Sequence, residues 1–382
     1  MPTTLPQPLL DQLRQHFSTR FTQGESNCLQ HGRDESVHEP LPPLAVVFAE
    51  STEEVALVVT LCAEYKVPMI PYGVGSSVEG HVLAPHGGIS IDLSGMKRII
   101  AIHTEDGDAT VQAGVTRLLV GSEGTLGIMT ELTVKLHPIP EAISAAVCTF
   151  PSIEAAVQTV IQTIQLGVPV ARIELLDALS LAAINKFSKT TLAEAPTLFF
   201  DFHGSPAAVA EHAETVQAIA DEMGGANFEW ATRPEDRSRL WQARHDAYFA
   251  CLQLKPGCRC FPTDVCVPIS RLAECIAATY DDIAQVSIPI ALFGHVGDGN
   301  FHLVVLVDRD NPQEMAEAAW ISERVVERAI ALDGTCTGEH GIGLGKRKYL
   351  VREHGAVAVD VMRALKIALD PHNLLNPGKV LP

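Results

Sequence analysis

Two histidines flank a glycine-rich turn in the second half of the chain. His295 follows an apolar, β-forming run at residues 288–293, and His302 lies in a second run at residues 301–307. A tight reversal between the two runs lets both imidazoles converge on one point. Glu339, in a later loop flanked by glycines, would add a carboxylate. Two imidazoles and a carboxylate suit a divalent metal such as zinc, with one coordination position left open for a substrate.

A purely structural interpretation of these residues stays open, in which each histidine packs or caps locally. Three residues of ligand type lie in loops punctuated by glycine, and His340 follows directly after the third. This accumulation favours a metal site over the local interpretation. It predicts a metal and does not by itself identify a reaction.

A second chemical feature is the loop at residues 72–81, which follows a short predicted strand at residues 67–71. Its three glycines allow close backbone approach, and successive N–H groups with two hydroxyls form a nest that suits a pyrophosphate. The spacing is not that of GxGxxG, so the loop alone does not establish phosphate binding. His81, at its end, is interpreted first as a packing or loop hydrogen-bonding residue.

The elements that must position these residues differ between the two parts of the chain. A helix is expected at residues 9–17 and a strand at 45–48, after which Ser51 and Glu54 predict a capping box that opens a helix. Further strands are expected at residues 88–93, 109–115 and 131–137.

From about residue 150 onward, long amphipathic helices dominate. Helices are predicted at residues 152–167, 207–224, 234–254, 270–285, 312–334 and 356–369, with strands near 145–150, 197–202, 227–231 and 264–268. We therefore expect two domains, residues 1–141 and 142–382, the second of them an α+β domain with an antiparallel sheet.

Composition excludes several classes of function. The 382-residue chain is 47% apolar and 19% charged, with a net charge of -18, which argues against sequence-independent nucleic-acid binding. No run approaches the about 20 apolar residues of a transmembrane helix, and the N-terminus lacks the pattern of a secretory signal. Nine dispersed cysteines fit a reducing compartment, so a cytoplasmic protein is expected, with peripheral contact at the inner face of the membrane left open.

Taken together, the motifs resemble the FAD-linked 2-hydroxyacid dehydrogenases of the vanillyl-alcohol-oxidase superfamily. Within it they are most similar to the cytochrome-linked D-lactate dehydrogenases and the glycolate oxidase flavin subunit. The matching stretches are residues 71–81, 88–93, 120–131, 244–245, 263–270, 294–302, 338–341 and 376–379. This resemblance implies a PCMH-type FAD-binding domain followed by an α+β cap domain.

The resemblance also implies which residues hold FAD. The pyrophosphate would lie against Pro71, Tyr72, Gly73, Gly75, Ser76, Ser77 and Gly80. The adenosine side would be lined by Gly121, Ser122, Gly124, Gly127 and Ile128. Asn376 and Lys379 would lie near the flavin ring.

For catalysis, the resemblance implies that His295, His302 and Glu339 hold zinc or manganese. This metal would bind a 2-hydroxy acid and make its hydroxyl more acidic. His340 would accept the hydroxyl proton, since an imidazole titrates near neutral pH. Arg244 would grip the substrate carboxylate, and electrons would leave FAD for a cytochrome or quinone-type acceptor. In the alternatives, His340 only orients Glu339, and Arg244 is a surface arginine facing Glu or Asp.

One departure from the family pattern affects the FAD-binding domain. Residues 114–117 (Gly-Val-Thr-Arg) run directly into residues 118–121 (Leu-Leu-Val-Gly), where relatives have several tens of further residues. That segment would supply much of the flavin contact and further strands. A second hypothesis follows, in which the chain is an impaired remnant that folds and binds metal but not FAD.

Overall fold

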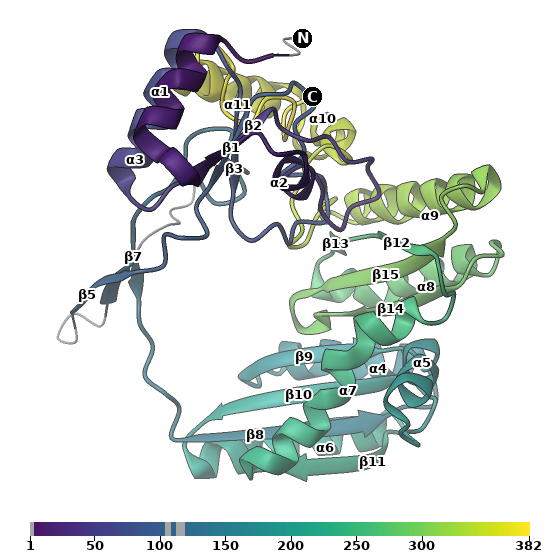
Figure 1. Ribbon diagram of the computed structural model, residues 1–382. Helices are drawn as coiled ribbons and strands as arrows, with labels where there is room; N and C mark the ends of the chain where they lie inside the picture. The colour runs from purple at the N-terminus through teal and green to yellow at the C-terminus, as the bar shows by residue number, and fades with distance from the viewer. Residues whose placement is uncertain (1–3, 104–107, 112–118) are drawn as a thin grey trace. The chain divides into compact units, whose positions relative to one another are not determined.

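The computed structural model describes residues 4–103, 108–111 and 119–382 (Figure 1). These residues form two compact units, one of residues 1–138 with 340–382 and one of residues 139–339. The first break lies next to the predicted domain boundary at residues 141/142. The C-terminal segment 340–382, which the sequence analysis assigned to the second domain, packs instead with the first unit.

The first unit is built on a four-stranded sheet in the order β1-β2-β4-β3. Strands β2 (Ala45–Phe48), β4 (Ile89–Asp92) and β3 (Met69–Tyr72) are parallel, and β1 (Phe21–Thr22) is antiparallel to β2. Apolar residues of α1 (Gln7–Phe17) and α3 (Thr52–Tyr65) form one core with these strands. The unit also contains α2 (Glu25–Gln30), α10 (Leu350–His354), α11 (Ala356–Leu369) and the 3-10 turns η1 (Ser18–Arg20) and η4 (Arg347–Tyr349).

A separate three-stranded antiparallel sheet belongs to the same unit. Its order is β5 (Ile99–His103), β6 (Asp108–Val111) and β7 (Leu132–Lys135). The side chains of Ile99, Ile100 and Ile102 are 65%, 50% and 57% exposed. This sheet therefore presents apolar side chains to solvent.

The second unit contains an eight-stranded antiparallel sheet. The order is β11 (Ala226–Ala231), β8 (Ala142–Thr149), β10 (Thr197–Gly204), β9 (Val170–Leu176), β14 (Ile290–Gly294), β15 (Asn300–Val307) and β12 (Arg259–Pro262), with β13 (Val265–Cys266) pairing β15. Helices α5 (Ala178–Ser188) and α7 (Pro234–Leu252) cover one face, and α4 (Ile153–Gln165), α6 (Pro206–Glu222) and α8 (Leu272–Ile283) cover the other (Figure 1). Helix α9 (Pro312–Ala331) packs on α8, which follows η2 (Ile269–Arg271).

The predicted reversal between the two histidines is a β-hairpin. Strands β14 and β15 pair antiparallel, with Phe293 opposite His302, and η3 (Val296–Asp298) connects them. Gly299 closes the turn at φ +81°, and a Cβ there would lie 2.1 Å from the carbonyl oxygen of Val267. The turn therefore requires glycine for both conformation and space.

Other predicted elements agree with the structure within a few residues, and the differences have local causes. The Ser51 hydroxyl accepts from the Glu54 N–H as predicted, but the Glu54 carboxylate accepts from the Glu50 N–H. Several elements were not predicted, namely β1, β5, β9, β12, α2, α5 and α10. In β9, charged residues interrupt the apolar pattern. The predicted strand at residues 264–268 shortens to two residues, and residues 112–115 of another lie outside the described ranges.

None of the helices in the described ranges is long and apolar enough to cross a membrane. The nine cysteines all lie in the described ranges; none of them forms a disulfide there, and seven are buried.

Candidate metal and cofactor sites

The three predicted metal ligands lie together in the second unit. His295 follows β14, His302 lies in β15, and Glu339 is the last residue of the unit. The Nε2 atoms of His295 and His302 lie 3.0 and 3.2 Å from one carboxylate oxygen of Glu339. One ligand atom from each residue lies within 4.8 Å of the others. The hairpin thus brings both imidazoles to one point.

The other ring nitrogen of His295 is held by a residue that sequence analysis missed. Its Nδ1 lies 2.7 Å from Oε1 of Glu174, a buried carboxylate in β9. This contact raises the pKa of His295, against the opposing effect of burial. Burial acts to raise the pKa of Glu174, but the hydrogen bond with His295 and the charge of Arg244 outweigh it, and this pKa lies below its ordinary value.

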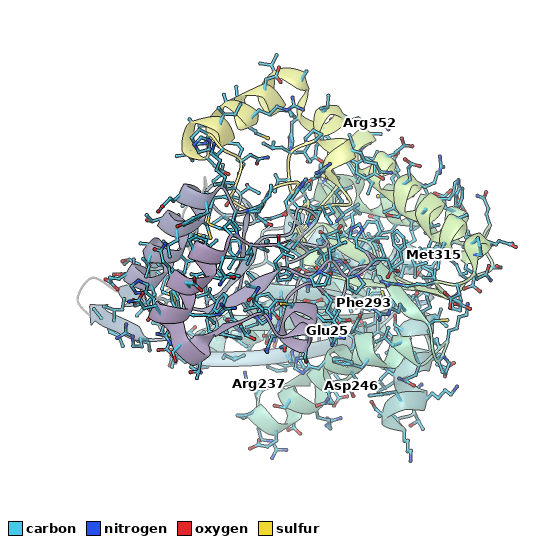
Figure 2. All side chains as sticks on the ribbon, turned by 45° about the horizontal axis from the view of Figure 1, so that its top comes forward. Glu25, Arg237, Asp246, Phe293, Met315 and Arg352 are labelled. Carbon is cyan, nitrogen blue, oxygen red and sulfur yellow. The ribbon has the colours of Figure 1, made fainter. Side chains whose placement is uncertain are left out.

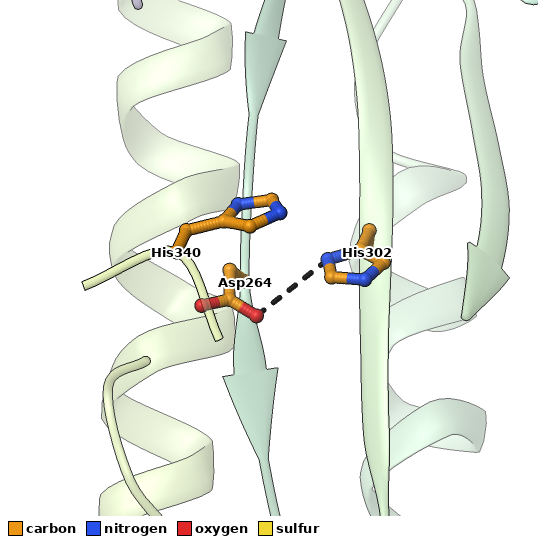
Figure 3. A group of neighbouring side chains, drawn as sticks. All are labelled: Asp264, His302 and His340. Atoms are coloured by element: carbon orange, nitrogen blue, oxygen red, sulfur yellow. Dashed lines mark ion pairs between the residues drawn. The ribbon is translucent and has the colours of Figure 1, made fainter. Parts of the chain in front are cut away.

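His302 is oriented from its Nδ1 side as well. This atom lies 3.3 Å from the carbonyl oxygen of Thr263 and 3.6 Å from Oδ1 of the fully buried Asp264 (Figure 3). The other oxygen of Asp264 accepts from the Glu339 N–H at 3.0 Å and from the Thr337 hydroxyl at 2.6 Å. Asp264 therefore contacts two of the predicted ligands, His302 through its ring and Glu339 through its backbone N–H.

This donor set fits a divalent metal. Both histidines direct Nε2 toward Glu339, while each Nδ1 faces a carboxylate or a backbone carbonyl. Histidines that bind a metal through one nitrogen commonly use the other in this way, because the outer contact fixes ring orientation and tautomer. Nitrogen and carboxylate donors suit zinc and manganese.

Arg244, on α7, lies beside this cluster. Its Nε donates to Oε2 of Glu174 at 3.0 Å, and its guanidinium carbon lies 5.0 Å from the centre of the Phe293 ring, a residue labelled in Figure 2. Arg244 does face a glutamate, as one alternative had it, but its side chain is only 16% exposed. Among the described residues, no acceptor contacts its two terminal nitrogens. Glu174 thus links Arg244 to His295.

The predicted pyrophosphate loop surrounds a cavity in the first unit. This cavity has a volume of about 230 Å³. It is lined by Pro71, Gly73, Val74, Gly75, Ser76, Ser77, His81, Val82, Glu123 and Asn376. Most of the residues assigned to the pyrophosphate therefore share one concave surface, together with Asn376.

Two of the loop's polar groups are engaged within the protein. Oδ2 of Asp34 accepts from the Ser77 hydroxyl at 2.5 Å and from the Gly80 N–H at 2.9 Å. Tyr72 is buried, and its ring centre lies 4.2 Å from that of His31. Asp34 therefore stabilises the end of the loop. The contact of residues 73–76 with a phosphate stays a prediction.

The predicted adenosine loop packs directly on the pyrophosphate loop. Gly124 has φ +72°, and a Cβ there would lie 2.6 Å from Cγ of Pro71. Ser122 is buried, and Ile128 packs against the core of this unit. A Cβ on Gly121 or Gly127 would have no atom of the described residues within 4 Å.

The C-terminal residues Asn376 and Lys379 reach both loops of the first unit. The Asn376 amide donates to the carbonyl oxygens of Glu123 at 2.6 Å and His81 at 3.2 Å. The Lys379 ammonium donates to the Leu83 carbonyl at 2.6 Å. Burial lowers the pKa of Lys379 to about 8. His340 belongs to this unit, directly after Glu339, and its role stays a prediction.

Comparison with known proteins gives two family matches. The family of FAD linked oxidases, C-terminal domain, matches residues 139–380, and an FAD binding domain matches residues 43–123. The chain is 41% identical to a probable mitochondrial D-lactate dehydrogenase of Danio rerio, over 92% of this chain and 87% of the relative. It is 35% identical to the mitochondrial D-lactate dehydrogenase [cytochrome] of Arabidopsis thaliana, over 99% and 81%. It is 30% identical to the glycolate oxidase subunit GlcD of Bacillus subtilis, over 94% and 93%.

Solved structures with the same fold are more distant in sequence. A 4-ethylphenol oxidase from Gulosibacter chungangensis superposes with a TM-score of 0.75 at 15% identity, covering 100% of this chain and 98% of that one. p-Cresol methylhydroxylase gives 0.74 at 16%, with the same coverage. The predicted fold class is confirmed.

The alignments also bear on the length of the chain. The alignment with the Danio rerio protein extends over 432 residues, although it uses 92% of a chain of 382 residues. Some tens of aligned positions therefore have no residue in this chain. The predicted gap, between Arg117 and Leu118, lies outside the described residues.

Proposed function

Because the chain belongs to the family of FAD linked oxidases, we propose that it oxidises D-lactate to pyruvate and passes the electrons to a cytochrome or quinone-type acceptor. Relatives at 31–41% identity carry the name D-lactate dehydrogenase, several of them with cytochrome in the name. The observation that carries the proposal is the cluster of His295, His302 and Glu339, with Arg244 beside it.

Binding of the hydroxy acid uses residues of the second unit. His295, His302 and Glu339 hold a divalent metal, which supplies Lewis acidity at the substrate hydroxyl. Arg244 receives the carboxylate on its two terminal nitrogens, because a guanidinium fork matches two carboxylate oxygens. Glu174 accepts from Nε of Arg244 and from Nδ1 of His295. It therefore fixes both groups in one arrangement.

Proton transfer is assigned to His340. In this proposal its imidazole accepts the hydroxyl proton as the C2 hydride leaves. FAD supplies the hydride acceptor, held by the loops at residues 71–80 and 121–128 and by Asn376. If His340 only orients Glu339, its removal should lower metal content; a base can be removed with the metal retained.

A second candidate is supported by the exposed sheet of the first unit. Three exposed isoleucines on β5 and the missing aligned positions are consistent with a lost segment that covers this sheet in relatives. In that case the chain binds metal but holds FAD poorly. The buried cysteines, which form no disulfide among the described residues, support a reducing compartment, which we propose is the cytoplasm.

Purification of the full chain tests both candidates. Flavin absorbance, metal content and reduction of an artificial acceptor by D-lactate should be measured together, with L-lactate as the control. Stoichiometric FAD with turnover of D-lactate alone is the expected result for the enzyme. A colourless chain that retains metal supports the impaired remnant, and a chain with neither contradicts both.

A further inference from the structure

Glu123 has an unusual position between the two loops predicted to bind FAD. It has φ +52°, a left-handed conformation that a glutamate rarely adopts, and its side chain is 4% exposed. It lines the cavity of the pyrophosphate loop. Neither the conformation nor the burial is expected for a charged residue without specific partners.

The hydrogen-bond donors to the Glu123 carboxylate lie more than 200 positions away along the chain. Oε1 accepts from the N–H of Ile342 at 2.7 Å and of Gly343 at 3.0 Å, and Oε2 accepts from Gly343 at 3.0 Å. Nε2 of His81 lies 3.4 Å from Oε1. Two successive backbone N–H groups thus form a nest around the buried carboxylate.

The segment that supplies this nest begins immediately after His340. Gly341 and Gly343 have φ +85° and +48°. A Cβ on Gly341 would lie 2.7 Å from Oε1 of Glu123, and one on Gly343 would lie 1.9 Å from the carbonyl oxygen of Glu79. The Leu344 N–H donates to that same carbonyl at 2.9 Å. The segment is therefore packed without free space against the pyrophosphate loop.

Glu123 also holds the C-terminal segment around Asn376 through its backbone. Its carbonyl oxygen accepts from the Asn376 amide, which donates to His81 as well. One residue thus contacts three segments: the pyrophosphate loop, the loop after His340, and the tail around Asn376.

We propose that Glu123 is a positioning residue that sets the place of His340 by fixing residues 341–343 to the two FAD-binding loops. The inference rests on the proposed function, in which His340 takes the substrate proton. A buried carboxylate with two N–H donors is difficult to replace, since a glutamine presents its own NH₂ where one oxygen now accepts. Loss of the Glu123 contacts therefore releases the loop that carries His340 from the two FAD-binding loops.

The test compares Glu123→Gln with Glu50→Gln, an exposed glutamate of the same unit. Amide hydrogen exchange of peptides covering residues 338–346 is measured on the full chain, with kcat and KM for D-lactate and FAD content measured in parallel. Glu123→Gln should raise exchange at residues 341–343 about tenfold, leave exchange in β14 and β15 unchanged, and lower kcat about tenfold with KM within about twofold. Glu50→Gln should match the parent.

Two results would overturn the proposal. One is unchanged exchange at residues 341–343, and the other is an increase spread evenly over the whole unit, which indicates loss of stability alone. If Glu123→Gln is insoluble, Glu123→Asp replaces it. This variant keeps the charge, but its shorter side chain moves the carboxylate away from the N–H groups of Ile342 and Gly343, so exchange must rise at the same residues. A parent chain without turnover contradicts the proposed function only, because the exchange measurement needs no substrate.

Discussion

The two antiparallel sheets of this protein differ in how they are covered. In the second unit every residue of β15 is buried between helix layers, and His302 lies on that strand with its ring held by buried neighbours. In the first unit, β5 exposes isoleucines on a three-stranded sheet. The comparison shows that the groups proposed for substrate and metal are preorganised, whereas the unit proposed for the flavin has an uncovered apolar surface.

The metal cluster and the flavin site need different amounts of surrounding structure. The metal cluster needs three side chains and their outer partners, all within one covered sheet and its adjoining loop. A flavin needs contacts along its full length, and phosphate contacts anchor it without fixing the reactive ring. The pyrophosphate loop is formed, with its cavity and its buried support from Asp34. The contacts expected from the missing segment are those that would position the ring.

The largest expected effect comes from restoring that segment. Inserting the corresponding stretch of a relative between Arg117 and Leu118 should cover the sheet of β5, β6 and β7, raise FAD occupancy to about one per chain, and increase turnover about 100-fold or more, since small misplacements of reacting atoms cost orders of magnitude in rate. Flavin absorbance and D-lactate oxidation measure this. A glycine-serine insert of the same length is the control.

If the chain without the insert already carries stoichiometric FAD and equals the restored chain in turnover, the contrast between the two units is wrong. The restored chain should also aggregate less, because exposed apolar surface and free strand edges promote association.

The next effect concerns the covered unit. His302→Ala should abolish stoichiometric metal binding and, if the enzyme is active, lower turnover about 1000-fold, as expected when several kcal/mol of Lewis-acid stabilisation are lost. Elemental analysis after mild dialysis is the measurement. His203→Ala, at a half-exposed histidine of β10, should retain the metal. Equal metal content in both variants would show that the cluster is structural.

A smaller effect is expected from the outer partner of the cluster. Glu174→Gln keeps the shape of the side chain but removes the charge that faces Nδ1 of His295, so metal affinity should fall about 10- to 100-fold. Since Glu174 also contacts Arg244, KM for D-lactate should rise in the same variant. Competition with a chelator measures the affinity, and Glu229→Gln, an exposed glutamate of this unit, is the control. If KM rises while metal affinity is unchanged, Glu174 only orients Arg244.

The sequence predicted the motif residues better than the residues that hold them in place. The two histidines could be identified because a glycine turn separates two β-forming runs, and the hairpin register follows from that pattern. Glu174 was missed because it lies in β9, where alternating charged residues conceal the strand. Asp264 was part of a matching stretch, but its contacts depend on pairing between β13 and β15. Glu123 lies within a quoted motif, yet the N–H groups that its carboxylate accepts from are more than 200 residues distant, which no local pattern indicates.

The packing of residues 340–382 with the first unit could likewise not be predicted from local sequence patterns. Helix α11 was predicted with the bounds that the structure shows, since its apolar periodicity is a local pattern. The packing of residues 340–382 with the first unit depends on contacts such as those of Asn376 with Glu123 and of Lys366 with the Thr125 carbonyl. These are single polar contacts of long range, and they become visible only when both partners are placed.

The smallest expected effect is a pH dependence that belongs to the first unit alone. Burial lowers the pKa of Lys379 to about 8, so below that pH the folded chain carries a buried ammonium whose charged form is disfavoured relative to the unfolded chain. As pH rises from about 8 toward the ordinary lysine value, the folded state releases its proton first, and stability should increase by at most about 1 kcal/mol per pH unit. Lys379→Met should flatten this slope, and Lys366 of the same unit, whose pKa is also lowered by burial, supplies the remainder. Thermal unfolding between pH 7.5 and 10, followed by hydrogen exchange in each unit, measures it, with Lys255→Met, a lysine of the second unit, as the control. A slope that is unchanged in Lys379→Met, or that appears equally in the second unit, would show that this buried amine does not set the pH response.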